Sequence, residues 1–253
     1  MKVRVLGSCG SRVPGHQTSC LLIDEQIVVD AGGITAKLSV DEQAGIDHVL
    51  ISHAHLDHVY DLAFLADNVM ARRSSPLRVW APEEVLDVLR RNLFNDQIWP
   101  DLTRLRLGGF PVLEFCCLPE GVTTLVGPLA VRWVPTSHTV FAAGYLLTGE
   151  KTSILYSGDT TTTDELWALG KVAESLAAVF VETSFPNRLE TLAFETGHLT
   201  PALLDLELAK LDKPEVPVKI FHMKPQYLEE ISAELASRQE RCRILNGNER
   251  FVF

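Results

Sequence analysis

A short run of residues, 53 to 58, carries four side chains that can bind metal ions: His53, His55, Asp57 and His58. Without a cation these groups would repel one another or stay poorly solvated, because they directly follow a buried apolar stretch. The two histidines of the first pair point the same way from an extended segment, whereas the second pair lies further round the turn. This spacing favours two divalent ions over one.

Each ion needs further ligands, and isolated histidine or aspartate residues at the ends of later strands can supply them. His138, Asp159 and His222 all follow segments with the pattern of strands. Histidine and carboxylate ligands suit zinc, iron and manganese, and we expect two divalent ions with zinc as the first choice. We interpret His16 and His48 as ordinary surface or core histidines.

Two neighbouring cations would support hydrolysis without a serine or cysteine nucleophile. A hydroxide shared between them has a pKa near neutrality, and the same ions hold the oxygens of the attacked group. Asp57 can orient that water as well as bind metal, so we expect it to be catalytic. These residue types therefore predict a metal-dependent hydrolase.

Apolar runs predict the strands that position these residues. The predicted strands include 20–23, 27–30, 48–52, 77–80, 154–156, 178–181 and 218–221. Segment 115–134 alternates apolar and small polar residues, which predicts two or three strands of a second sheet. The sequence Thr162-x-x-Glu165 predicts a capping box at the start of a helix. Thr200 followed by Pro201 predicts the start of another helix, which runs through Leu211.

Length and composition place the chain among ordinary globular proteins. Its 253 residues are 46% hydrophobic and 22% charged, and we expect one domain covering 1–253. The formal net charge of −10 disfavours a long nucleic acid as partner, although it does not exclude a small anion. The five cysteines, without a C-x-x-C pair, and the lack of an apolar leader or membrane-length run predict a cytoplasmic protein with no membrane contact.

The metal-binding pattern resembles that of a known superfamily. The order H-x-H-x-D-H after a strand, a lone histidine, a Gly-Asp pair and a last histidine is similar to the metallo-β-lactamase superfamily. The resemblance implies an α/β fold, a four-layer αβ/βα sandwich of two mixed β-sheets flanked by helices. It also implies one ion held by His53, His55 and His138. The second ion would be held by Asp57, His58 and His222, with Asp159 bridging the two.

Four further segments narrow the resemblance. They are 93–101 (LFNDQIWPD), 182–187 (ETSFPN), 197–201 (GHLTP) and 221–225 (FHMKP). Together they resemble the class II cyclic-nucleotide phosphodiesterases. That resemblance implies hydrolysis of 3′,5′-cyclic AMP, with cyclic GMP as a second substrate, to the 5′-nucleotide.

A phosphate-binding role is also expected near residue 198. His198 lies just before the helix that begins at Thr200 and Pro201, where backbone N–H groups and the helix dipole favour an anion. We therefore predict that His198 and Thr200 contact substrate. His198 either binds the phosphate or protonates the leaving 3′-oxygen, and closing a helix cap is its structural alternative. Glu182 is expected to orient His198. Asn95 is a candidate for binding the base or ribose, and a purely structural loop is its alternative.

Other functions remain open at this point. The main rival is a tRNA 3′-processing endonuclease, which resembles this chain in its Glu-x-Thr and Gly-His-x-Thr elements. That family generally inserts a substrate-gripping arm between the third-motif histidine and the bridging aspartate. Here these residues, His138 and Asp159, are only 21 positions apart (159 − 138), which leaves no room for an arm. A non-catalytic metal-binding scaffold is a further alternative, and a homodimer is compatible with the sequence.

Overall fold

The computed structural model describes residues 1–253 and contains two seven-stranded mixed sheets packed face to face. The first sheet has the order β16-β1-β2-β3-β4-β5-β8 and the second the order β15-β14-β13-β12-β11-β10-β9. The strands of the first sheet are β1 (Lys2–Gly7), β2 (Cys20–Ile23), β3 (Ile27–Val29), β4 (His48–Leu50), β5 (Leu77–Ala81), β8 (Leu113–Cys117) and β16 (Arg250–Val252). The strands of the second sheet are β9 (Thr124–Val126), β10 (Leu129–Thr136), β11 (Ala142–Thr148), β12 (Ser153–Tyr156), β13 (Leu176–Glu182), β14 (Val218–Phe221) and β15 (Cys242–Ile244).

Each sheet combines an antiparallel half with a parallel half. In the first sheet, β3, β4, β5 and β8 run parallel, and in the second sheet β12, β13, β14 and β15 do so. Because β11 is antiparallel to both β10 and β12, the ends of β10 and β12 lie at the same edge. The carboxyl ends of parallel strands are where α/β folds bind ligands.

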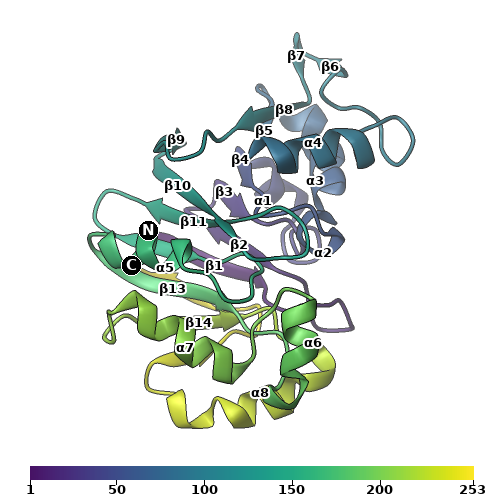
Figure 1. The fold of residues 1–253 in the computed structure, drawn as a ribbon. Helices are drawn as coiled ribbons and strands as arrows, with labels where there is room; N and C mark the ends of the chain where they lie inside the picture. The colour runs from purple at the N-terminus through teal and green to yellow at the C-terminus, as the bar shows by residue number, and fades with distance from the viewer.

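Helices cover the outer face of each sheet (Figure 1). Those next to the first sheet are α1 (Val40–Ala44), α2 (Leu56–Val59), α3 (Leu62–Val69) and α4 (Glu83–Asn92). Those next to the second sheet are α5 (Glu165–Val172), α6 (Glu190–Glu195), α7 (Pro201–Leu211) and α8 (Leu228–Glu234). A small hairpin of β6 (Arg106–Leu107) and β7 (Phe110–Pro111) projects from the body (Figure 1). None of the helices combines the length and apolar character needed to cross a membrane.

Three buried clusters of apolar side chains separate these layers. The central cluster joins side chains of both sheets, including Leu50, Tyr145 and Tyr156, and the other two lie between each sheet and its helices. The parallel strands β12 and β14 are almost entirely buried, as expected for strands covered on both faces. The four-layer αβ/βα sandwich predicted from the sequence is therefore confirmed.

Two local predictions were wrong. Segment 115–134 does not belong wholly to the second sheet, because β8 pairs in parallel with β5 of the first sheet. Thr162 does not form a capping box, since α5 takes Asp164 as its N-cap residue and no side chain bonds there. The alternating pattern shows that a segment is a strand, but it carries no information on which sheet the strand joins.

Candidate metal centre and its surroundings

The predicted metal ligands meet at one edge of the sandwich. His53 follows β4, His55 is the N-cap residue of α2, and Asp57 and His58 lie within that helix. The remaining ligands come from the second sheet and follow β10, β12 and β14: His138, Asp159 and His222. Residues separated by up to 169 positions (222 − 53) in the sequence thus converge where the two sheets face each other.

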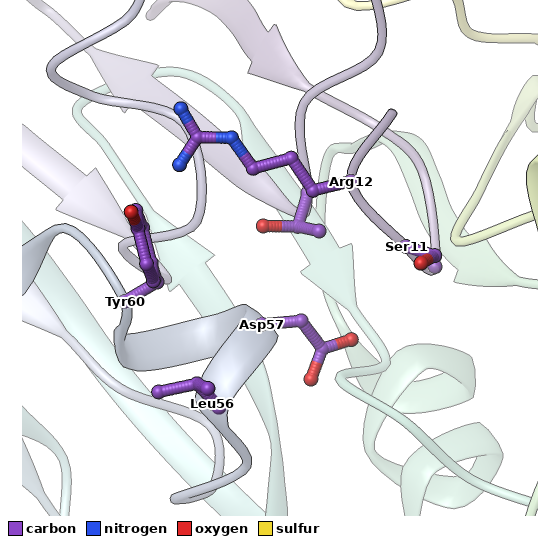
Figure 2. Close-up of a pocket in the computed structure, with 7 residues that line it drawn as sticks. Ser11, Arg12, Leu56, Asp57 and Tyr60 are labelled. Carbon is purple, nitrogen blue, oxygen red and sulfur yellow. The ribbon is translucent and has the colours of Figure 1, made fainter. Parts of the chain in front are cut away.

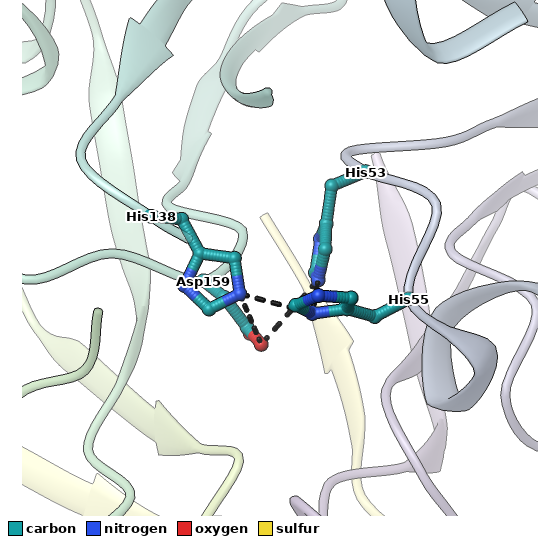
Figure 3. Close-up of side chains that lie close together, drawn as sticks. All are labelled: His53, His55, His138 and Asp159. Atoms are coloured by element: carbon teal, nitrogen blue, oxygen red, sulfur yellow. Dashed lines mark hydrogen bonds and ion pairs between the residues drawn. The ribbon is translucent and has the colours of Figure 1, made fainter. Parts of the chain in front are cut away.

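The first group consists of His53, His55, His138 and Asp159, whose ligand atoms all lie within 4.8 Å of one another. Figure 3 shows the three imidazole rings and the carboxylate pointing into a common space. The inner atoms are close together: His55 Nδ1 lies 3.1 Å from His53 Nε2 and 3.0 Å from His138 Nε2. This donor set matches the one predicted for the first ion.

The second group consists of Asp57, His58 and His222. His222 Nε2 lies 3.2 Å from His58 Nε2 and 3.1 Å from Asp57 Oδ2. Asp159 lies between the two groups, because its oxygens are 3.6 Å from His53 Nε2, 3.4 Å from His58 Nε2 and 3.2 Å from His222 Nε2. The structure therefore gives Asp159 the central position predicted for it.

The outer ring nitrogens show that this cluster is built for cations. His138 Nδ1 donates to Gly197 O at 2.8 Å, and His58 Nδ1 donates to Asp30 Oδ2 at 2.7 Å. His53 Nδ1 donates to Ser52 Oγ at 3.0 Å, and His222 Nδ1 donates to Ser184 Oγ at 2.8 Å. In both cases the hydroxyl donates onward to a carboxylate, so it accepts from the imidazole.

A neutral imidazole that donates from Nδ1 presents a lone pair at Nε2. Four such lone pairs therefore face the centre, together with an Asp159 Oδ1 atom that is buried without a hydrogen-bond partner. Lone pairs about 3 Å apart repel one another unless a cation lies between them. The residues present thus fit two divalent cations, and His53, His58, His138 and His222 would bind them through Nε2.

Asp30, at the end of β3, organises half of the cluster and was not predicted to do so. Its fully buried carboxylate accepts from the backbone N–H and hydroxyl of Ser52, from His58 Nδ1 at 2.7 Å, and from the Tyr156 hydroxyl at 2.6 Å. It thereby sets the ring orientation of both His53 and His58. In the sequence, the only sign of this role is an acidic residue placed directly after a buried strand and before the small residues Ala31, Gly32 and Gly33.

Asp30→Asn should weaken metal binding and lower stability. The amide that replaces one oxygen has hydrogens of its own, so at least one of the buried donors loses its acceptor. We expect the dissociation constant of the metals to rise about 10-fold to 100-fold, and the free energy of unfolding of the metal-free protein to fall by about 2 kcal/mol. Metal titration and urea unfolding measure the two effects. The exposed Asp67→Asn, on α3, is the control, and unchanged metal affinity in Asp30→Asn would contradict the assigned role.

His198 lies beside the cluster and is held by Glu182. Its Nδ1 donates to Glu182 Oε1 at 2.7 Å, and Glu182 in turn accepts from the Ser184 hydroxyl and from Thr160 N. Glu182 ends β13 and is fully buried, whereas His198 remains slightly exposed. The predicted contact between the two residues is present. His198 also belongs to a third group of candidate ligands with Asp159 and His222.

Burial lowers the pKa of His53, His55 and His138, whereas nearby carboxylates raise the pKa of His198 and of His58 against the effect of burial. Burial by itself lowers the pKa of His198, but the Glu182 carboxylate outweighs it and raises the pKa above its ordinary value. Burial holds the pKa of His53 well below its ordinary range. His198 is therefore suited to carry a proton, while His53 stays neutral, as a metal ligand must.

The helix N-terminus does not form the anion site expected there. The N–H groups of Ala202 and Leu203, in the first turn of α7, already donate to Asn187 Oδ1 and Thr200 Oγ1. Thr200 is fully buried and is the predicted N-cap residue of α7, where its hydroxyl accepts from Leu203 N, so its contact with substrate stays a prediction. The predicted substrate contact of His198 is supported instead by its hydrogen bond to Glu182 and by its position beside the metal ligands.

Asn95 also has a local structural role. Its side-chain oxygen accepts from Gln97 N and Ile98 N, and its amide nitrogen donates to Arg91 O. Both ends of the amide therefore serve the loop after α4, which favours the structural alternative over base or ribose binding.

Two glycines allow the ligand-bearing loops to approach closely. Gly197 has a φ of 72°, and a Cβ there would lie 2.7 Å from His138 Nδ1. A Cβ at Gly10 would lie 2.4 Å from the backbone oxygen of His222. Larger residues at these positions would displace the ligands.

The site and fold agree with the family comparison. Residues 27–236 match the model of the β-lactamase superfamily domain. The chain belongs to this superfamily. Its metallo-β-lactamase fold places the histidine and aspartate cluster of the superfamily at the edge described above.

Relatives within the superfamily include proteins named for cyclic-nucleotide hydrolysis. A Yersinia pestis protein named "Probable 3′,5′-cyclic-nucleotide phosphodiesterase" is 31% identical over 212 residues, which are 72% of this chain and 58% of that protein. The chain spans little more than half the length of the first curated relatives it matches, 58% and 54%.

Solved structures support the fold. The crystal structure of unliganded yeast PDE1 aligns with a TM-score of 0.84 and 21% identity over 99% of both chains. The short form of human tRNase Z aligns with a TM-score of 0.73 and 16% identity over 100% of this chain and 99% of that one. The fold alone therefore does not separate these two activities.

Proposed function

We propose that this protein is a binuclear metal-dependent phosphodiesterase that hydrolyses 3′,5′-cyclic AMP, and cyclic GMP as a second substrate, to the 5′-nucleotide. The observation that carries the proposal is the pairing of a seven-ligand cluster with His198, whose pKa is raised by Glu182. The relatives named as 3′,5′-cyclic-nucleotide phosphodiesterases support the same reaction class.

The protein's residues have distinct tasks in this reaction. Two bound divalent cations would supply an acidified water as nucleophile and hold the phosphate oxygens. Asp57, at the open side of the cluster, orients the water as well as binding metal. His198, whose Nδ1 is held by Glu182, donates its Nε2 proton to the leaving 3′-oxygen. Asp30 and Ser184 hold the histidine rings so that their inner nitrogens stay fixed.

The structure offers no arm for the tRNA-processing alternative between His138 and Asp159. That interval consists of β11, β12 and their short connections. The chain has a formal net charge of −10, so its surface does not generally attract the negatively charged backbone of a long RNA. These features favour a small phosphodiester over tRNA.

One assay separates the alternatives. The protein is loaded in turn with Zn²⁺, Mn²⁺ and Fe²⁺ and incubated with cyclic AMP, cyclic GMP, bis(p-nitrophenyl) phosphate and a 3′-extended tRNA. We expect conversion of the cyclic nucleotides to 5′-nucleotides and loss of that activity after chelation. Cleavage of the tRNA alone would overturn the proposal, and two bound metals without turnover on any substrate would favour a scaffold.

A further inference from the structure

A cavity of about 450 Å³ opens beside Asp57, on the side of the cluster formed by α2 and the loop after β1. Leu56 and Tyr60, four positions apart at the two ends of α2, form part of its wall. Leu56 is 69% exposed and Tyr60 is 39% exposed, so large apolar surfaces face this space. The volume lies within the range of small-molecule sites, roughly 300 to 1,000 Å³.

Arg12, in the loop after β1, lines the same cavity and contacts Tyr60 at the end of α2. Its guanidinium carbon is 4.7 Å from the centre of the Tyr60 ring, which is a cation–π distance. Figure 2 shows the Arg12 side chain reaching toward Tyr60, while the Asp57 carboxylate points away from that ring. Arg12 forms no hydrogen bond or ion pair in the structure, although the chain has an excess of acidic residues. Its donors are free for a ligand.

The loop that carries Arg12 is tied to the metal centre. Gly10 N donates to Met223 O, next to the ligand His222, and Ser8 N and Cys9 N both donate to Gln17 O at the base of the loop. The other wall, α2, carries the ligands Asp57 and His58. Both walls of the cavity are therefore tied directly to the metal ligands.

From this geometry we propose that the cavity binds the nucleobase of the substrate, with Tyr60 and Leu56 packing against the base and Arg12 selecting its edge. The inference rests on the proposed phosphodiesterase function and extends it to base recognition. Nucleobases stack on aromatic rings and on guanidinium planes, and Tyr60 with Arg12 offers both. In this arrangement, the metal cluster would hold the phosphate of the nucleotide. Tyr60 and Arg12 would contact the base, and the ribose would join the two.

The side chain of Arg12 distinguishes guanine from adenine. The guanidinium has only donors, and it pairs with the two acceptors O6 and N7 of guanine, whereas the same edge of adenine offers one acceptor and one donor. Arg12 is therefore expected to contribute more to the binding of cyclic GMP than to the binding of cyclic AMP.

Two other cavities border the cluster but suit a base less well. The cavity next to His55 measures only about 80 Å³. The cavity next to His138 measures about 440 Å³, yet its only large apolar side chain is Phe194 and its only charged one is the acidic Glu195. Phe194 is therefore a matched aromatic control for Tyr60.

Steady-state kinetics test the assignment. The substrates are cyclic AMP, cyclic GMP and methyl p-nitrophenyl phosphate, a diester without a base. For Tyr60→Ala we expect the ratio of kcat/KM on either cyclic nucleotide to kcat/KM on the base-free diester to fall about ten-fold, mainly through KM. Tyr60→Phe should restore that ratio, because it keeps the ring. Arg12→Ala should lower the ratio about ten-fold for cyclic GMP and much less for cyclic AMP.

Controls and a binding measurement complete the test. Arg132, an exposed arginine on β10, is replaced by alanine as the matched control and should change nothing. Calorimetry on the metal-loaded protein compares 5′-GMP with ribose 5-phosphate, and Tyr60→Ala should abolish the advantage of the base-containing ligand. An unchanged ratio in Tyr60→Ala, or a fall in Phe194→Ala instead, would overturn the assignment.

Two further outcomes separate the hypotheses. If Arg12→Ala slows the base-free diester as much as cyclic GMP, Arg12 serves the phosphate and its role as a base selector is overturned. If the wild-type protein hydrolyses the diester but neither cyclic nucleotide, the proposed function fails, and the calorimetric comparison still decides whether the cavity binds a base.

Discussion

Asp159→Ala is expected to abolish phosphodiester hydrolysis and to reduce the bound metal to less than two ions per chain. Asp159 is the one carboxylate whose oxygens lie within 3.6 Å of histidine nitrogens from both ligand groups. Without it, neither ion is held by its full donor set, and the repulsion between the two sites is no longer compensated. Because metal ions contribute several kcal/mol to the transition state, kcat/KM should fall by about three orders of magnitude or more.

Elemental analysis of the purified protein and turnover of cyclic AMP measure the two effects. Asp164→Ala is the matched control, since this aspartate lies five positions further on, is 87% exposed and pairs only with a surface lysine. It should retain both metals and full activity. Two tightly bound ions and near-normal turnover in Asp159→Ala would show that the two donor groups bind their ions independently.

His198→Ala is expected to slow hydrolysis of cyclic nucleotides by about 100-fold to 1,000-fold, the usual contribution of a general acid. The loss should be much smaller for bis(p-nitrophenyl) phosphate, because nitrophenolate leaves readily without a proton. Both metals should remain, since His198 Nδ1 is occupied by Glu182 and the raised pKa favours a protonated ring, which cannot bind a cation.

The comparison between the two leaving groups distinguishes an acid from a ligand. A metal ligand would be needed equally for both substrates, whereas a proton donor matters only for the poor leaving group. Glu182→Gln should show the same dependence on leaving group in weaker form. His48→Ala, at the opposite end of β4 from the site, is the histidine control. Loss of a metal in His198→Ala would identify His198 as a ligand and remove it from the acid role.

Local sequence patterns correctly predicted those features that depend on only a few neighbouring residues. The run from His53 to His58 indicated a metal centre because such groups are costly to place together without cations. The strands β2 and β14 were predicted with their observed bounds, since short apolar runs flanked by polar residues rarely have another outcome. The start of α7 at Thr200 and Pro201 followed from capping rules.

The tertiary structure decided everything that depends on distant residues meeting. The assignment of β8 to the first sheet, the role of Asp30 as an acceptor for three side chains and the use of Asn95 within its own loop all depend on contacts that no local pattern encodes. The helix N-terminus is a clear case. The sequence predicted that the N–H groups in the first turn of α7 bind phosphate. In the structure, one of them donates to the Asn187 side chain.

For this protein, the sequence by itself determined the kind of chemistry, because ligand types, their spacing and the resemblance to metallo-β-lactamases follow from residue identity. Only the folded chain decided which side chains orient those ligands, that His198 is held by Glu182, and that Arg12 and Tyr60 face each other beside Asp57. The physical reason is that hydrogen bonds and stacking depend on positions within a few ångström. Loops from two different sheets reach those positions only after the central core has packed.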